Sequence, residues 1–145
     1  MKKIICRMLV IVALCSISFM LCSCSASDQR EYYKEKTNYI TVKGTVSHIK
    51  YNEAADALYL GFLELSPKLD DSNFKITGNN LRIAQENGID HCIELGEQIE
   101  FVTAPRYFGD GYVMPIVAIS VGGKTLLPFE DGYTNLVNEI DGMDK

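Results

Sequence analysis

The chain contains 145 residues, of which 47% are apolar and 23% are charged, with 11 glycines and 4 prolines. This composition excludes a disordered or collagen-like chain, and the length suffices for one compact core but not for a multidomain enzyme. The 19 acidic residues outnumber the 14 basic ones, which argues against a nucleic-acid partner because clustered Lys and Arg supply the affinity for nucleic acids.

The first segment has the organisation of a secretory signal peptide. Lys2, Lys3 and Arg7 form a positively charged region, and an apolar stretch of 14 residues follows over Met8–Leu21. This stretch is shorter than the roughly 20 residues that a helix needs to cross a bilayer. We therefore expect a signal peptide that is cleaved rather than a permanent transmembrane helix.

The end of this segment, Leu21-Cys22-Ser23-Cys24, resembles the lipobox of bacterial lipoproteins, with Cys22 as its one departure from the usual small residue. The resemblance implies that residues 1–23 are removed and that Cys24 receives lipid and anchors the chain to the bacterial membrane outside the cytoplasm. Two or more acyl chains give lasting attachment. The alternative is an ordinary cleaved signal peptide that contains cysteines. Lipidation at Cys22 is disfavoured because bulky Met20 and Leu21 would precede the cleaved bond.

Processing changes the charge and the thiol content of the chain. Removing the three basic residues of the signal leaves 11 basic against 19 acidic residues, a formal charge of −8. With Cys24 lipidated, Cys92 is the one thiol that remains, so the mature chain cannot form an internal disulfide. His91 is its only local basic partner, and on a strand the two side chains would point to opposite faces, which favours a buried, inert Cys92.

Residues 24–38 comprise the lipidated cysteine and a flexible tether, and residues 39–145 form the folded domain. The segment 25–37 has no apolar pattern and would reach about 45 Å if fully extended. Tyr32 and Tyr33 either pack on the domain or lie at the lipid interface.

The alternation of apolar and polar residues predicts the first three strands. Residues 39–48 alternate, with His48 on the apolar-facing side, and the phase then shifts to Ile49 and Tyr51, which predicts a bulged first strand. After a polar turn at 52–56, the next strands are expected at 57–65 and 73–77, separated by a loop at 68–72.

The second half adds helical segments. Residues 79–87 have helix-forming composition and Gly88 follows as a stop signal, which predicts a short helix. Alternating segments at 98–104 and 112–121 flank Gly109-Asp110-Gly111, a strong turn sequence. A further short strand is expected at 124–129 and a terminal helix at 134–140.

This order of elements, over residues 39–121, resembles the five-stranded OB barrel. The expected fold is mainly β, a small five-stranded OB-like barrel with one short helix between strands 3 and 4 and a short C-terminal helix. A meandering sandwich is the competing architecture. By these features the chain resembles bacterial lipoproteins that carry an OB-like domain.

The loop between the fourth and fifth strands is the candidate binding site. Arg106, Tyr107, Phe108 and Tyr112 bring three aromatic rings and a guanidinium group around the glycine turn. Such groups suit sugar rings, peptide side chains or a partner surface, and OB folds usually bind ligands through this loop and the face of strands 2 and 3. The alternative is a structural hairpin whose aromatic rings pair across the strands.

Loop carboxylates are the candidate metal ligands, in the pairs Glu53 with Asp56 and Asp70 with Asp71. Neither pair has the ligand ladder of a calcium loop, so solvated loops are favoured and neither a metal nor another cofactor is expected. No nucleophile elbow, phosphate loop or zinc-binding helix motif occurs.

The resulting functional hypothesis is a membrane-anchored extracytoplasmic lipoprotein that acts as a non-enzymatic binding module for a protein, peptide or glycan. The alternative is a small envelope hydrolase or metal-dependent enzyme that uses loop carboxylates. A close His–carboxylate pair in a concave pocket would favour the enzyme, and a shallow aromatic patch would favour the binding module.

Overall fold

The computed structural model describes residues 28–108 and 111–142, and the chain divides into two compact units, Met1–Glu35 and Lys36–Lys145. In the first unit residues 28–34 are helical, an element that the sequence analysis did not predict. The rings of Tyr32 and Tyr33 meet edge to face there, 5.5 Å apart. The expected signal peptide and Cys24 lie outside the described residues.

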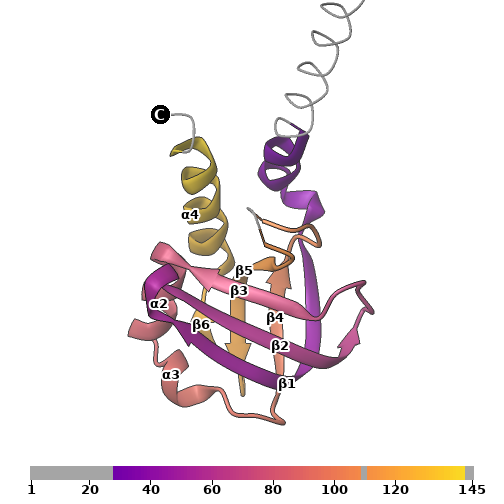
Figure 1. Ribbon diagram of the computed structural model, residues 1–145, viewed down its shortest axis with the longest axis vertical. Helices are drawn as coiled ribbons and strands as arrows, with labels where there is room; N and C mark the ends of the chain where they lie inside the picture. Colours follow the sequence, from indigo (N-terminus) through magenta and orange to yellow (C-terminus); the bar gives the residue numbers. More distant parts are fainter. Residues whose placement is uncertain (1–27, 109–110, 143–145) are drawn as a thin grey trace, which may run out of the picture. The chain divides into compact units, whose positions relative to one another are not determined.

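The second unit contains a closed OB-like barrel, which confirms the predicted fold class (Figure 1). Antiparallel pairings join β1 to β2 and β4, β2 to β3, and β4 to β5, and a short parallel pairing of β3 with β5 closes the barrel. The barrel strands are β1 (Ile40–Asn52), β2 (Ala57–Ser66), β3 (Asn73–Thr77), β4 (Gln98–Thr103) and β5 (Met114–Val121).

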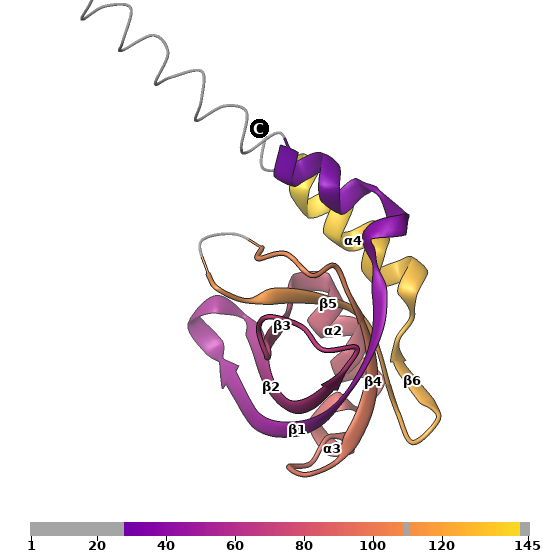
Figure 2. The ribbon, with the colours of Figure 1, turned by 90° about the vertical axis from the view of Figure 1, so that its right-hand side faces the viewer.

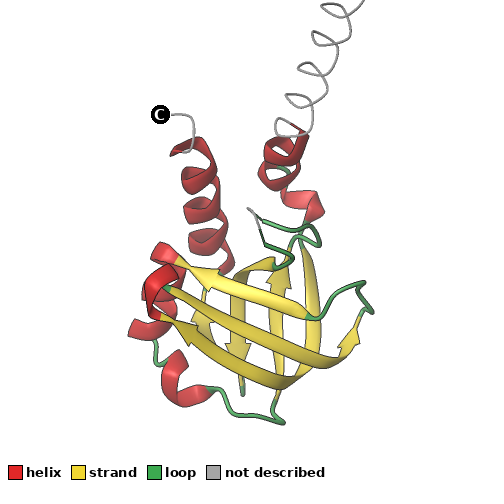
Figure 3. Ribbon diagram, viewed as in Figure 1, coloured by secondary structure: helices red, strands yellow, loops and turns green. Residues whose placement is uncertain are grey.

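The remaining elements surround this barrel (Figure 3). A further strand, β6 (Lys124–Leu127), pairs with β5, and Figure 2 shows it on the outside of the barrel. The helices are α2 (Gly78–Glu86), α3 (Ile89–Cys92) and α4 (Phe129–Gly142), and the 3-10 turns are η1 (Lys36–Asn38) and η2 (Glu53–Ala55).

The barrel interior is filled by apolar side chains from alternate positions of the strands. Three phenylalanines form its centre: Phe62 stacks on Phe101 at 4.6 Å, and Phe74 meets Phe101 edge to face at 4.7 Å. All three are almost completely buried. Aromatic pairs of this geometry add to the stabilisation that burial alone provides.

The bulge predicted in the first strand is present, but it lies one residue earlier than the sequence suggested. Ser47 is the extra residue on β1, between the pairs Val46–Phe62 and His48–Gly61. Because a bulge moves the following side chains to the opposite face, His48 is exposed. The prediction of a core histidine is therefore wrong.

Helix α2 begins and ends one residue earlier than the predicted range 79–87, and its C-cap is Asn87. Gly88 follows the cap with a positive φ of 92°, as its predicted role as a stop signal requires. The next residues, which include His91 and Cys92, form the short helix α3, so the strand geometry assumed for this pair is wrong. Cys92 is half-buried rather than buried and packs against the core.

A second bulge changes the pattern of β5. Val102 pairs with Ala118 and Thr103 with Ile116, so Val117 is the extra residue. The regular alternation expected over 112–121, which would place Val117 and Ile119 on one face, is therefore wrong: Ile116 and Ile119 face the core cluster, whereas Val117 is buried outside it.

Helix α4 covers β5 at this bulge and is longer than the predicted 134–140 (Figure 1). Gly132 is buried in its first turns, and a Cβ atom there would overlap the carbonyl oxygen of Val117. The glycine is thus what allows the helix backbone to approach the strand so closely.

The start of the second unit is fastened to the first turns of α4. The Lys36 Nζ lies 4.8 Å from the centre of the Tyr133 ring and 2.7 Å from Glu130 Oε2. Tyr39 meets the rings of Phe129 and Tyr133 edge to face at 5.7 and 5.6 Å. We refer to these five residues as the Lys36 clamp.

Candidate functional site

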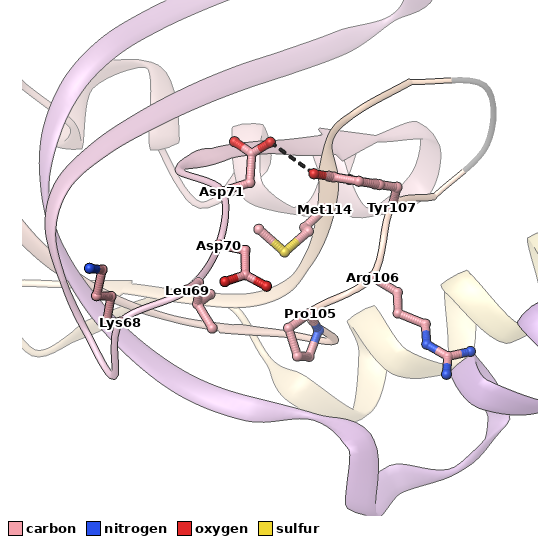
Figure 4. Close-up of a pocket in the computed structure, with 8 residues that line it drawn as sticks. All are labelled: Lys68, Leu69, Asp70, Asp71, Pro105, Arg106, Tyr107 and Met114. Carbon is pink, nitrogen blue, oxygen red and sulfur yellow. Dashed lines mark hydrogen bonds between the residues drawn. The ribbon is translucent and has the colours of Figure 1, made fainter.

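Two loops that are distant in sequence meet at one end of the barrel. One joins β2 to β3, and the other joins β4 to β5 and is described at residues 104–108 and 111–113. The phenol of Tyr107 donates a hydrogen bond to Asp71 Oδ2 at 3.2 Å (Figure 4). This contact links the two loops directly.

Asp71 is held in place by its own backbone turn. Its Oδ1 accepts hydrogen bonds from the N–H of Ser72 at 2.6 Å and from the backbone and side-chain nitrogens of Asn73, both at 3.0 Å. Partial desolvation acts to raise the pKa of Asp71, but these hydrogen bonds, with that of Tyr107, outweigh it and hold the pKa below its usual value. Asp71 therefore presents a fixed, ionised acceptor to Tyr107.

The two exposed tyrosines of the β4–β5 loop form a pair. Their rings meet edge to face with centroids 5.5 Å apart, and Tyr107 is 39% exposed and Tyr112 79% exposed. Desolvation raises the pKa of Tyr107, and the hydrogen bond and negative charge of Asp71 raise it further, so its phenol remains a donor at neutral pH. The result is an ordered aromatic pair that faces solvent.

A pocket of about 450 Å³ lies on the Tyr107 side of this pair. Figure 4 shows the two acidic residues of the β2–β3 loop on one wall and Tyr107 on the other, with the guanidinium group of Arg106 pointing away from them. The lining residues come from both loops and β5: Lys68, Leu69, Asp70, Asp71, Pro105, Arg106, Tyr107 and Met114.

The structure separates the four predicted binding residues. Tyr107 and Tyr112 lie together, and Arg106 is exposed with its guanidinium turned away from the pocket (Figure 4). Phe108 is only 6% exposed, and the Lys75 Nζ lies 5.2 Å from the centre of its ring. Because Phe108 N–H also donates to Val113 O at 3.1 Å, this residue holds the loop against the barrel. Gly109 and Asp110, the centre of the predicted turn, lie outside the described residues.

A second hollow of about 340 Å³ lies on the Tyr112 side of the pair, over the outer surface of β1, β2 and β3. In the sequence, only the resemblance to OB folds points to this strand face, and no motif identifies its residues. Alternation in β1 and β2 would have identified part of it, had the bulge at Ser47 been placed correctly. Its lining residues are His48, Lys50, Asn52, Tyr59, Leu60, Gly61, Asn73, Phe74, Tyr112 and Val113.

The other loop carboxylates considered as ligands do not converge. Asp56 accepts a hydrogen bond from the Tyr51 phenol at 3.0 Å, in the turn after η2, whereas Asp70 lies in the wall of the first pocket. Within the described part of the chain, no group of three or more His, Cys, Asp or Glu residues is arranged to hold a metal ion.

None of the helices in the described residues has the length and apolar character required to cross a membrane. Comparison of the chain with protein-family models, curated proteins and solved structures finds no match.

Proposed function

We propose that the chain is a lipid-anchored extracytoplasmic lipoprotein whose barrel is a non-enzymatic binding module for a protein, peptide or glycan. The observation that carries the proposal is the exposed pair of Tyr107 and Tyr112, held by Asp71 between two hollows. Anchoring is supported by the sequence that ends at Cys24.

The tyrosine pair has the physical properties of a binding anchor. Tyrosine offers a large apolar surface with one polar tip and few rotatable bonds, and it is enriched among the residues that dominate binding energies. The contact with Asp71 orders Tyr107 before any ligand arrives, which reduces the conformational entropy that binding would cost.

The hydrogen bonds of the Asp71 carboxylate support this interpretation. One of its oxygens receives three hydrogen bonds within the β2–β3 loop and the other receives the Tyr107 phenol. Its carboxylate is therefore used to position the loops. This arrangement supports a recognition surface formed by the rings and not by the acid.

Photo-crosslinking in intact cells tests the proposal. A photoreactive amino acid in place of Tyr112 should capture a specific partner, and the same amino acid in place of Leu95 is the matched control. Leu95 is also an exposed side chain, at 67%, but it lies in the turn before β4.

The expected result is a product that forms from position 112 and not from position 95, and that weakens when Tyr107→Ala is added. Equal labelling from both positions, or labelling that Tyr107→Ala leaves unchanged in a folded protein, would refute the assignment of the site.

A further inference from the structure

The outer surface of β1, β2 and β3 carries two rows of residues that cross the three strands. Lys50 pairs with Tyr59, which pairs with Lys75. In the next row, His48 pairs with Gly61, which pairs with Asn73. Directly paired residues of a sheet point to the same side, so these six residues share one surface, which we call the three-strand face.

Gly61 creates the hollow of this face. A Cβ atom at Gly61 would lie 3.0 Å from His48 Cβ and 3.3 Å from Ser47 Oγ, so a side chain there would fill the space between β1 and β3. Tyr59 in the adjacent row and Tyr112 from the β4–β5 loop line the same hollow. Its lining thus includes two phenol rings and a backbone floor.

The charge of the three-strand face is opposite to that of the domain around it. Residues 36–145 contain 16 acidic and nine basic residues, yet none of the described residues that line the hollow is acidic. Within residues 28–108 and 111–142, the side chain of Lys50 makes no hydrogen bond or ion pair, although its backbone is paired with β2. Lys75 lies beside the hollow and does not line it: its ammonium group is over the Phe108 ring, and its charge opposes the desolvation that raises the pKa of Glu139. Lys50, as the one lysine in the described lining, which has no acidic residue, makes an anion the favoured occupant.

The position of the face within the sheet restricts how a ligand can bind. β2 is paired on both sides, by β1 and by β3, so its main chain has no free edge for an added peptide strand. Recognition has to come from side chains. The face supplies ring surfaces, ammonium groups and two carboxamides. Asn52 Oδ1 already accepts from the N–H groups of Ala54 and Ala55, and Asn73 Nδ2 already donates to Asp71. The groups that can hydrogen-bond hydroxyl groups are therefore Asn52 Nδ2 and Asn73 Oδ1.

We infer that the three-strand face binds an acidic saccharide, with a sugar ring against Tyr59 and Tyr112 and its carboxylate, sulfate or phosphate groups at Lys50 and Lys75. The two lysines lie two strands apart, about 10 Å between Cα atoms, so one short oligosaccharide can reach both. This inference rests on the proposed function, because Tyr112 belongs to both sites, and it specifies the chemical class of the ligand.

Calorimetry on the full chain in detergent tests the inference. The probes are short oligosaccharides that carry uronate, sulfate or phosphate groups, each paired with its neutral parent; methyl-esterified trigalacturonate, for example, is the neutral form of trigalacturonate. At least one acidic probe should bind about fivefold or more tightly than its parent, and rising salt should weaken the difference by screening. Equal binding, or no binding, of every acidic probe and its parent overturns the inference.

Variants then locate the binding. Lys50→Gln and Lys75→Gln should each lower the affinity for the acidic probe about two- to fivefold, as expected for exposed charge pairs. Gly61→Ala should also lower this affinity, because the added methyl group fills part of the hollow. Lys43→Gln is the matched control, because Lys43 is an exposed lysine of the same strand that pairs with Glu100 instead. An equal loss in Lys43→Gln would contradict the location.

The two proposals fail in different ways. If Tyr112 captures a partner in cells while acidic and neutral probes bind alike, the binding module stands and the acidic ligand is refuted. If an acidic peptide or a single-stranded oligonucleotide binds more tightly than every saccharide, the ligand class is likewise refuted. If acidic probes bind through Lys50 and Lys75 but nothing is captured from position 112, the inference stands and the assignment of the loop site fails.

Discussion

Asp71 and Tyr107, which are 36 positions apart in the chain, set the geometry of the candidate site through one hydrogen bond. The carboxylate is fixed by the turn that follows it, and the phenol is fixed by the carboxylate. Because each group affects the ionisation of the other, their contact can be followed by titration.

Replacing Asp71 with Asn should lower the pKa of Tyr107 towards its ordinary value of 10.0, since the variant removes the negative charge and the anionic acceptor. NMR titration of ring-labelled tyrosine measures this. Tyr51 is the internal control, because its raised pKa depends first on its hydrogen bond to Asp56 and should not change. An unchanged Tyr107 pKa would contradict the contact.

The lowered pKa of Asp71 also predicts an acid dependence of stability. A carboxyl group whose pKa is lower in the folded state stabilises that state above its unfolded pKa, near 3.8, and loses this contribution as the pH falls through the folded value. The free energy of unfolding, measured by denaturant titration between pH 5 and pH 2, should therefore fall less steeply for Asp71→Asn than for the wild type. A steeper fall in the variant would show that folding does not lower the pKa of Asp71.

Phe108 and Tyr112 should respond oppositely to truncation. Phe108→Ala removes a buried ring and should lower the free energy of unfolding by about 3 kcal/mol. Tyr112→Ala removes an exposed ring and should change it by less than about 0.5 kcal/mol. Thermal and denaturant unfolding of both variants measures this, and a similar loss in both would identify the loop as a structural hairpin.

Among the elements, α4 approaches β5 so closely at Gly132 and Val117 that a Cβ atom on Gly132 would overlap the backbone of the strand. The helix therefore depends on a residue that has low helix propensity. Packing, and not local preference, determines the choice of glycine there.

Gly132→Ala should destabilise the domain by about 1 to 3 kcal/mol, because the new methyl group forces α4 away from β5. Gly142→Ala is the matched control in the same helix, since no atom lies within 4 Å of its added Cβ, and it should be neutral or slightly stabilising. Denaturant unfolding compares the two. Equal stability of both variants would show that α4 does not pack on β5 as described.

Elements defined by interactions between residues close in sequence could be predicted, and features defined by contacts between distant residues could not. Alternation in β1 and the stop at Gly88 are local signals, and both led to correct elements. The bulges at Ser47 and Val117 are set by which residues pair across the barrel, so the sequence misplaced His48 and the face of Val117. The contact of Tyr107 with Asp71 is also long-range. The sequence singled out both residues but placed them in separate candidate sites, a binding loop and a pair of loop carboxylates.

At the scale of the whole molecule, the barrel needs the parallel pairing of β3 with β5 to close. The order of elements predicted this architecture because strand–strand–strand–helix–strand–strand resembles the order of the five-stranded OB barrel. The proposed membrane attachment does not follow from the barrel and is tested separately.

Cys24→Ala should block lipid attachment and either release the protein from the membrane or stop its processing. Detergent phase partitioning, together with the mass of the chain, measures both outcomes. Cys22→Ala is the matched control and should leave attachment intact. A Cys24→Ala protein that is cleaved and still partitions into the detergent phase would refute the lipoprotein assignment.

If the chain is tethered as proposed, the Lys36 clamp has a mechanical consequence. A pull on the chain ahead of the barrel would enter the second unit at Lys36, whose ammonium group is bound to Glu130 and lies over Tyr133. Part of that load passes to the first turns of α4, and through the contact of Gly132 with Val117 to β5, instead of falling entirely on the first hydrogen bonds of β1. Tension at the anchor would thus be shared by both ends of the domain's sequence, and the candidate site between the β2–β3 and β4–β5 loops does not lie on that route.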